Sequence, residues 1–228
     1  SVRAREYRAL VRRRSSIIKE VTRTKNRIKS LLQFHGISIP RDYRRRNWSG
    51  RFIRWLETVK LTSESGNESL ESLLRQLAYY RDEEAAMSRK IRALARTDPY
   101  KEPAKYLTSI PGIGVISAMI WLTELVDIHR FQRFDHLTSY VGLVPWERSS
   151  GERSGTAGLD RRGNRRLRTL LIENSWAAMR KDPGLMSAYY ELTHRMHGNK
   201  AIIRIARKLL RRIRYVLIHE TTYEMGLA

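Results

Sequence analysis

The chain of 228 residues has 45 lysines and arginines against 23 aspartates and glutamates, so its formal net charge at pH 7 is +22. With 41% hydrophobic residues, this is the composition of a folded basic protein, and it excludes a disordered polar tail. The absence of cysteine excludes a disulfide-stabilised fold, thiolate metal ligands and a cysteine nucleophile.

Apolar side chains first recur along residues 3–35 in alternating steps of three and four, which predicts one long helix. A short amphipathic helix is predicted over residues 52–59, and a second long apolar seam covers residues 70–94. Two long seams joined by a connector indicate either an antiparallel helical hairpin or an intermolecular coiled coil. Arg14 and Glu84 are polar positions within the seams, and they either specify the register or are ordinary imperfections.

A linker at Asp98-Pro99 divides the chain into a helical hairpin or coiled-coil dimerisation region, residues 1–98, and a second domain, residues 99–228. The second domain also has helical periodicity, except at residues 145–163, whose glycines and serines predict an irregular loop. Because the chain shows no alternation of strands with helices, the predicted fold class is all-α.

The positive charge is concentrated in two blocks. Residues 1–60 contain 18 basic and 4 acidic residues, residues 145–228 contain 17 and 8, and the segment between them is close to neutral. Two basic blocks indicate an extended or bipartite nucleic-acid surface, whereas the alternative is a generally basic, solvated surface. The longest apolar stretch, residues 115–122, is too short to cross a bilayer, and the arginine-rich residues 1–14 do not form a secretory signal. We therefore expect a soluble, cytoplasmic protein that binds nucleic acid rather than a membrane.

The first candidate site is the turn Ile110-Pro111-Gly112-Ile113-Gly114, which precedes a predicted helix. Gly112 and Gly114 permit a tight turn whose backbone N–H groups can meet a phosphate oxygen at the start of that helix. The pattern resembles the hairpin of helix-hairpin-helix DNA-binding modules, whose contacts to the nucleic-acid backbone carry no sequence information. The alternative is a glycine turn that only permits two helices to pack closely.

The second candidate site is the Ser/Gly/Arg loop together with the start of the helix that follows it. Its planar guanidinium groups match phosphate oxygens, and its serine hydroxyls could attack a phosphodiester while arginines stabilise the developing charge. The spacing alone favours phosphate binding over catalysis, because no histidine or lysine lies close in sequence to act as a base. The candidate binding residues are Arg148, Arg153, Arg161, Arg162, Arg165, Arg166 and Arg168.

The third candidate site is the predicted helix over residues 200–214. Its aliphatic residues form one apolar stripe, and its basic residues occupy the remaining arc, which either contacts nucleic acid or is a solvated face. The candidate binding residues are Arg204, Arg207, Lys208 and Arg211. Glu191, His194 and His197 follow one another at three-residue steps that drift around a helix, so no metal site is expected there.

Several strings of residues together resemble a known family. They are Leu107–Gly114, Tyr140–Pro145, Ser150-Gly151, Arg162–Arg168 and Ala206–Leu209. Their order and spacing are similar to those of the C-terminal transposase domain of the insertion-sequence one-ten family, the DEDD transposases. These enzymes are related to Piv-type invertases and are known as bridge-RNA-guided recombinases. The match covers residues 106–228, and residues 1–98 are similar in architecture to the coiled coil that precedes this domain.

The resemblance implies a part in DNA transposition or site-specific recombination. It implies that Ser150, with Ser149 as the second choice, forms a covalent link to a DNA phosphate. The serine would act with an N-terminal RuvC-like α/β domain whose four acidic residues hold a divalent metal, expected to be magnesium. That domain is not in this sequence, so we expect a fragment that has no cofactor of its own and is inactive alone.

The resemblance also implies the partners. These are DNA, a structured guide RNA, and further copies of the chain in homodimers or homotetramers assembled through the coiled coil, with the complex at the bacterial nucleoid. The alternative function is a non-catalytic helix-hairpin-helix module that holds DNA or RNA by its phosphates. A third possibility is a structural oligomerisation protein whose basic faces only keep it soluble.

Overall fold

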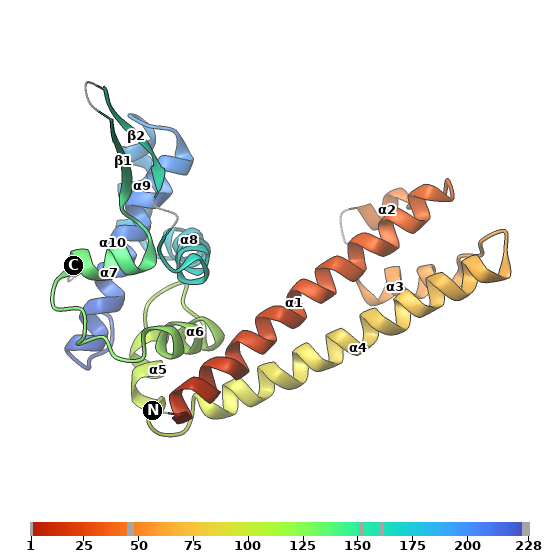
Figure 1. The fold of residues 1–228 in the computed structure, drawn as a ribbon, viewed down its shortest axis with the longest axis horizontal. Coiled ribbons are helices and arrows are strands. Elements are labelled where there is room, and N and C mark those ends of the chain that lie inside the picture. The colour runs from red at the N-terminus through yellow and green to blue at the C-terminus, as the bar shows by residue number, and fades with distance from the viewer. Residues whose placement is uncertain (1, 45–47, 151–152, 160–161, 225–228) are drawn as a thin grey trace. The chain divides into compact units, whose positions relative to one another are not determined.

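The computed structural model describes residues 2–44, 48–150, 153–159 and 162–224. Apart from one β-hairpin, the elements are helices, so the predicted all-α class is confirmed (Figure 1). In chain order the elements are α1 (Val2–Phe34), α2 (Arg41–Arg44), α3 (Gly50–Thr58), α4 (Glu64–Leu94), α5 (Lys101–Thr108), α6 (Val115–Leu125), α7 (Phe134–Val141), β1 (Pro145–Ser150), β2 (Arg153–Leu159), α8 (Arg165–Met179), α9 (Pro183–Thr193) and α10 (Gly198–Ile218). Within the described residues, no helix is both long enough and apolar enough to cross a bilayer.

The β-hairpin corrects the prediction of an irregular loop over residues 145–163. Residues 145–150 and 153–159 form two antiparallel strands, with an irregular register between Pro145 and Glu147. The prediction was wrong because it relied on glycine and serine content. A two-stranded ribbon is held by main-chain hydrogen bonds between its strands, so it needs no alternation of apolar and polar residues.

The helices belong to two compact units. The hairpin unit comprises Arg12–Arg89, and the C-terminal unit comprises Ser1–Val11 with Lys90–Ala228. The division lies within α1 and within α4. The reason is that Val11 and Ile91 are buried together with Ala104 and Met119, so both helix ends belong to the core of the C-terminal unit.

In the hairpin unit, α1 and α4 run antiparallel (Figure 1). The Thr24 hydroxyl donates to Oε1 of Gln76 at 3.2 Å, and the Arg14 guanidinium meets the Glu84 carboxylate at 2.5 Å, so partner numbers fall along α4 as they rise along α1. Buried Ser88 accepts a hydrogen bond from Arg14 and donates one to Glu84. The two polar seam positions are therefore partners, and they define the register of this hairpin.

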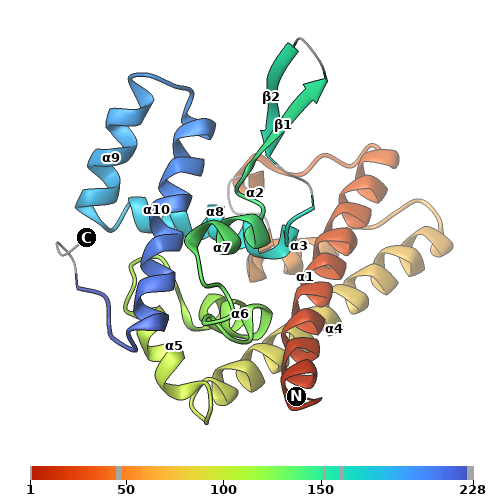
Figure 2. The ribbon, with the colours of Figure 1, turned by 60° about the vertical axis from the view of Figure 1, so that its left-hand side comes forward.

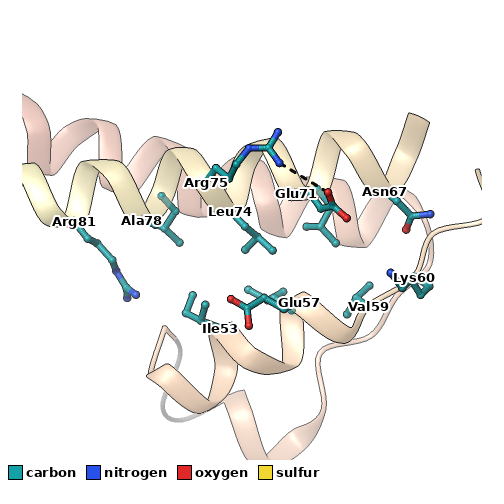
Figure 3. Close-up of a pocket in the computed structure, with 13 residues that line it drawn as sticks. Ile53, Glu57, Val59, Lys60, Asn67, Glu71, Leu74, Arg75, Ala78 and Arg81 are labelled. Carbon is teal, nitrogen blue, oxygen red and sulfur yellow. Dashed lines mark ion pairs between the residues drawn. The ribbon is translucent and has the colours of Figure 1, made fainter. Parts of the chain in front are cut away.

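Helix α3 packs against the end of the same hairpin at which α1 ends and α4 begins. The Ser49 hydroxyl caps it by accepting from the Phe52 N–H at 3.3 Å, and Phe52 and Leu56 are fully buried in one core with residues of α1 and α4. A cleft of about 410 Å³ remains between α3 and α4, with Ile53 and Leu74 in its lining (Figure 3). The short helix predicted over residues 52–59 is thus confirmed, beginning two residues earlier.

In the C-terminal unit, α10 is the central element and contacts α5, α7, α8 and α9 (Figure 2). The aliphatic stripe predicted for this helix is buried and continues past residue 214 to Leu217. The indole of Trp121 is also fully buried, and it donates to Oδ1 of Asn174 at 3.5 Å across α6 and α8. This helical core carries the three candidate sites.

Candidate nucleic-acid interface

The serine-bearing segment is the tip of the β-hairpin. Ser150 is the last residue of β1 and its Cα partner is Arg153, the first residue of β2. Ser149 pairs with Ser154, and Arg148 pairs with Gly155. The hairpin register therefore brings the backbone of the proposed nucleophile directly opposite that of a candidate phosphate-binding arginine.

Both ends of the hairpin are held at one point of the helical core. Gly142 ends α7 in the left-handed conformation with φ 79°, and a Cβ on Gly163 would lie 2.3 Å from the Cα of Gly142. The Asn164 N–H donates to the Tyr140 carbonyl at 2.7 Å across the same crossing. Only glycine allows the two chain segments to approach this closely. The residues that flank the hairpin, Gly142 and Gly163, are consequently in direct contact at its base.

A buried carboxylate, Glu124, fastens that base. Its side chain is 1% exposed, accepts from the Asn164 amide at 3.3 Å and lies 3.6 Å from Nε of Arg166. Asn164 in turn caps α8, because its Oδ1 accepts from the N–H groups of Arg166 and Leu167. A buried carboxylate is stabilised only by such pairing, so Glu124 ties the end of α6 to the start of α8. The sequence analysis missed this residue, and its one signal is an acidic residue two positions after the apolar stretch of residues 115–122.

The candidate arginines around the hairpin are placed differently. Arg162 and Arg165 are exposed, while Arg168 is half-buried beside Gly142. Arg166 pairs with Glu124, so the charge of its guanidinium is partly neutralised within the fold. Arg148 lies on β1 and Arg153 on β2, and Arg161 lies outside the described residues.

The two glycines of the 110–114 turn differ in their surroundings. A Cβ on Gly112, whose φ is 89°, would lie 2.5 Å from the backbone N of Ala178. The Asn174 amide also donates to the Gly112 carbonyl at 2.9 Å. Gly112 is therefore required for close packing on α8, which is the alternative that the sequence left open. Gly114 instead is exposed, has open space at its Cβ and begins α6 without a side-chain cap.

The basic arc of α10 divides into internal and exposed residues. Arg212 and Arg214, outside the candidate set, bind within the fold: Arg212 pairs with Asp182 at 2.6 Å, and Arg214 donates to the Gln132 carbonyl. Arg207 is half-buried with its guanidinium 3.9 Å from the Asp135 carboxylate.

The exposed part of this arc forms one stripe along α10. Arg204, Lys208 and Arg211 are solvent-exposed at steps of four and three residues, which keeps them on one face of the helix. Two exposed residues that the sequence analysis did not select extend this α10 stripe: Lys200 at one end and Tyr215 at the other. The four cations cover about 16 Å at 1.5 Å of rise per residue. Such a row can meet several phosphates of one nucleic-acid strand.

The histidines near α9 and α10 have structural positions. Nδ1 of His197 accepts from the Asn199 N–H at 3.2 Å and caps α10, and His194 ends α9. Across the described ranges, no group of three or more histidine or acidic side chains is arranged to hold a metal ion.

Comparison with known proteins identifies the C-terminal unit. The model of the transposase IS116/IS110/IS902 family matches residues 104–191, which include the Gly112–Gly114 turn, the β-hairpin and α8.

Individual relatives extend the similarity to nearly the whole chain. It is 30% identical over 230 residues to the transposase for insertion sequence element IS1111A of Coxiella burnetii, covering 99% of this chain and 62% of that protein. It is 27% identical over 235 residues to a probable family 20 transposase of Pseudomonas aeruginosa, covering 99% of this chain and 67% of that protein. It is also 32% identical over 156 residues to the insertion element IS110 43.6 kDa protein of Streptomyces coelicolor, covering 67% of this chain and 37% of that protein. The chain thus spans less than two thirds of the Coxiella and Streptomyces relatives. Its residues 104–191 belong to the transposase domain of the IS116/IS110/IS902 family.

Proposed function

We propose that this chain binds nucleic acid in a DNA transposase and supplies Ser150 to strand exchange. The observation that carries this proposal is the β-hairpin whose tip holds Ser150 opposite Arg153 and whose two ends meet at Gly142 and Gly163. A nucleophile must be held within a narrow range of positions relative to the reacting phosphorus. A hairpin fixed at one base meets that requirement better than a free loop does. The transposase family of the relatives supports the same assignment.

In the proposed step, the Ser150 hydroxyl oxygen forms a bond to phosphorus of a DNA phosphodiester. One ester P–O bond breaks, the serine hydroxyl loses its proton, and the released sugar oxygen gains one. Arginines of the hairpin and of the start of α8 would stabilise the negative charge on the non-bridging oxygens. The family resemblance implies a magnesium-binding RuvC-like domain as the source of metal assistance, and none of this chain's residues is proposed to hold that ion.

The proposed partners follow from the same reading. The exposed α10 stripe of Lys200, Arg204, Lys208 and Arg211 is proposed to follow the phosphates of DNA or of a structured guide RNA. Assembly into homodimers or homotetramers through α1 and α4, and a place at the bacterial nucleoid, are further proposals that rest on the resemblance.

The catalytic proposal is tested by trapping a covalent adduct. A protein that joins this chain to a RuvC-like domain is incubated with guide RNA and a suicide DNA substrate, and the adduct is detected on a denaturing gel. Ser150→Ala is expected to abolish the adduct, whereas Ser149→Ala and the matched control Ser154→Ala retain it. An adduct formed by Ser150→Ala at the wild-type level would remove Ser150 from the mechanism.

A second candidate function is a non-catalytic module that grips phosphates at the start of α6. The open N-terminus at Gly114 favours it, because free N–H groups at a helix N-terminus bind anions. Gly114→Ala adds a methyl group into open space, so any loss of DNA affinity would report close approach of a phosphate to this backbone. Unchanged affinity in that variant, together with weakened binding in Lys208→Gln, would place the contact on α10 instead.

A further inference from the structure

Cations gather at Trp48 in the hairpin unit, which contains none of the candidate sites. Nζ of Lys25 lies 5.5 Å from the centroid of the Trp48 ring, and the Arg81 guanidinium donates to the Trp48 carbonyl at 2.6 Å. Lys29 follows Lys25 by one turn of α1, so their side chains share one side of that helix. Lys25 of α1 and Arg81 of α4 therefore meet at the segment that begins α3, and the charge of Lys29 acts on Lys25.

This cluster has no compensating carboxylate among the residues that the structure describes. Among those residues, no ion pair joins Lys25, Lys29 or Arg81 to an acidic side chain. Burial lowers the pKa of Lys25, and the charges of Arg81 and Lys29 lower it further. By contrast, Arg14 on the same two helices is neutralised by Glu84. The Trp48 cluster thus has an excess of positive charge that the fold itself does not balance.

The cluster is also held in place before any ligand arrives. Trp48 has φ 73° and its ring lies edge-on to Phe52, with centroids 5.3 Å apart, so the indole is fixed against the buried core. Arg81 extends from α4 toward the start of α3, and one of its five N–H donors is occupied by the Trp48 carbonyl (Figure 3). The remaining donors of Arg81 and the ammonium groups of both lysines are available to an anion.

We propose that Lys25, Lys29 and Arg81 form a binding site for one phosphate group of a nucleic-acid backbone. A guanidinium and two ammonium groups offer the hydrogen bonds and the charge that phosphate oxygens require. The inference rests on the proposed nucleic-acid function and extends it. It assigns a defined phosphate contact to the helical hairpin, where the sequence indicated only a block of basic residues. Two of the 18 basic residues of the first 60, Lys25 and Lys29, then have a binding role.

The first measurement uses inorganic phosphate as the probe. The melting temperature of the chain is followed while phosphate replaces chloride at constant ionic strength, in wild type, Lys25→Met and Lys60→Met. Methionine keeps the apolar stem on Trp48 and removes the charge, and exposed Lys60 lies beyond the other end of α3 as a matched control. Wild type and Lys60→Met should gain stability from phosphate, because a ligand that binds only the folded state raises the melting temperature. Lys25→Met should lose that gain.

The second measurement uses a DNA duplex across a salt series. Loss of one phosphate contact should make the slope of log K against log salt shallower by about 0.9 in Lys25→Met. The slope for Lys60→Met should stay closer to that of wild type. Lys25→Met should also melt no lower than wild type in chloride, because removing one of several crowded cations relieves repulsion. A lower melting temperature with an unchanged salt slope would mean that Lys25 is only structural.

The outcomes separate this site from the proposed function. Equal phosphate stabilisation in all three proteins, or none in wild type, overturns the site even when DNA binding through α10 persists. If phosphate stabilisation is lost in Lys25→Met but the DNA slope is unchanged, the nucleic-acid assignment is overturned, leaving an adventitious anion site. If wild type binds no DNA while phosphate stabilisation depends on Lys25, the proposed function fails and the anion site stands.

Discussion

The two glycines of the 110–114 turn lead to opposite predictions for the same substitution. Alanine at Gly112 must adopt φ 89°, and its Cβ would lie 2.5 Å from the backbone N and 2.8 Å from the Cα of Ala178. The atoms in the way are main chain within α8, so no side-chain rotation relieves the clash. At Gly114 the φ is −92° and no atom lies within 4 Å of the added Cβ.

The expected magnitudes follow from these geometries. A left-handed conformation costs a non-glycine residue about 1–2 kcal/mol, and forcing extra volume into a packed contact costs about 1–3 kcal/mol. Gly112→Ala should therefore lose about 2–5 kcal/mol, which for a chain of this size lowers the melting temperature by about 5–15 °C. Gly114→Ala loses only the small advantage of glycine over alanine at a helix N-cap, on the order of 0.5 kcal/mol.

The assay is urea and thermal unfolding of wild type and both variants, followed by circular dichroism. Each variant is the control for the other, because both add one methyl group to the same turn. A Gly112→Ala protein that melts within 2 °C of wild type would refute the assignment of this glycine to packing, where 2 °C corresponds to about 0.5–1 kcal/mol. So would equal destabilisation by both substitutions.

Three further predictions concern the rest of the C-terminal unit. Glu124→Gln should destabilise it by about 1–3 kcal/mol, because the charge opposite partly exposed Arg166 is lost, and thermal melts that match wild type would contradict this. Burial alone would raise the pKa of Asp182, but hydrogen bonds from the Leu185 N–H and the Tyr223 hydroxyl, with the charge of Arg212, outweigh it and hold the pKa below its usual value. Asp182 therefore stabilises the fold above its ordinary pKa of about 3.9 and loses this effect as pH falls through the lower folded value. The difference in melting temperature between wild type and Asp182→Asn should be smaller at pH 3 than at pH 7. An equal difference at both pH values would contradict this dependence of stability on the ionisation of Asp182. Lys208→Gln should lower the DNA salt slope by about 0.9 with an unchanged melting temperature, and an unchanged slope would exclude Lys208 from the interface.

The long helices are the elements that the sequence predicted best. The apolar seams of residues 3–35 and 70–94 predicted α1 and most of α4, and the stripe of residues 200–214 predicted the buried face of α10. The beginning of α4 lies six residues before its predicted seam. Its first turns include serine, glycine and asparagine, whose low helix propensity is offset by local hydrogen bonds such as that from the Leu61 N–H to Asn67 Oδ1.

The β-hairpin and its base show where such reading fails. Residues 145–150 pair with residues 153–159 through the main chain, and the glycines and serines of this segment gave the pattern of a loop. Glu124 and Asn164 are 40 positions apart and meet only because α6 and α8 pack together. Ser150 was identified from the sequence through a family resemblance. In the structure, strand pairing with Arg153 holds the backbone at that serine. Its catalytic role stays a prediction.

By itself, the sequence determined the all-α class, the two basic blocks and the family, because periodicity, charge and motif spacing are properties of local residue order. Only the tertiary structure decided which charges are used within the fold. Arg212 and Arg214 bond to other residues of the fold while Arg204 and Lys208 face solvent. Among the described residues, Arg14 meets a carboxylate and Lys25 does not. The physical reason is that a charged side chain's function depends on the neighbours that compete for it. Those neighbours come from helices far apart in the chain, so the net charge of +22 predicts a polyanion but not where the polyanion binds.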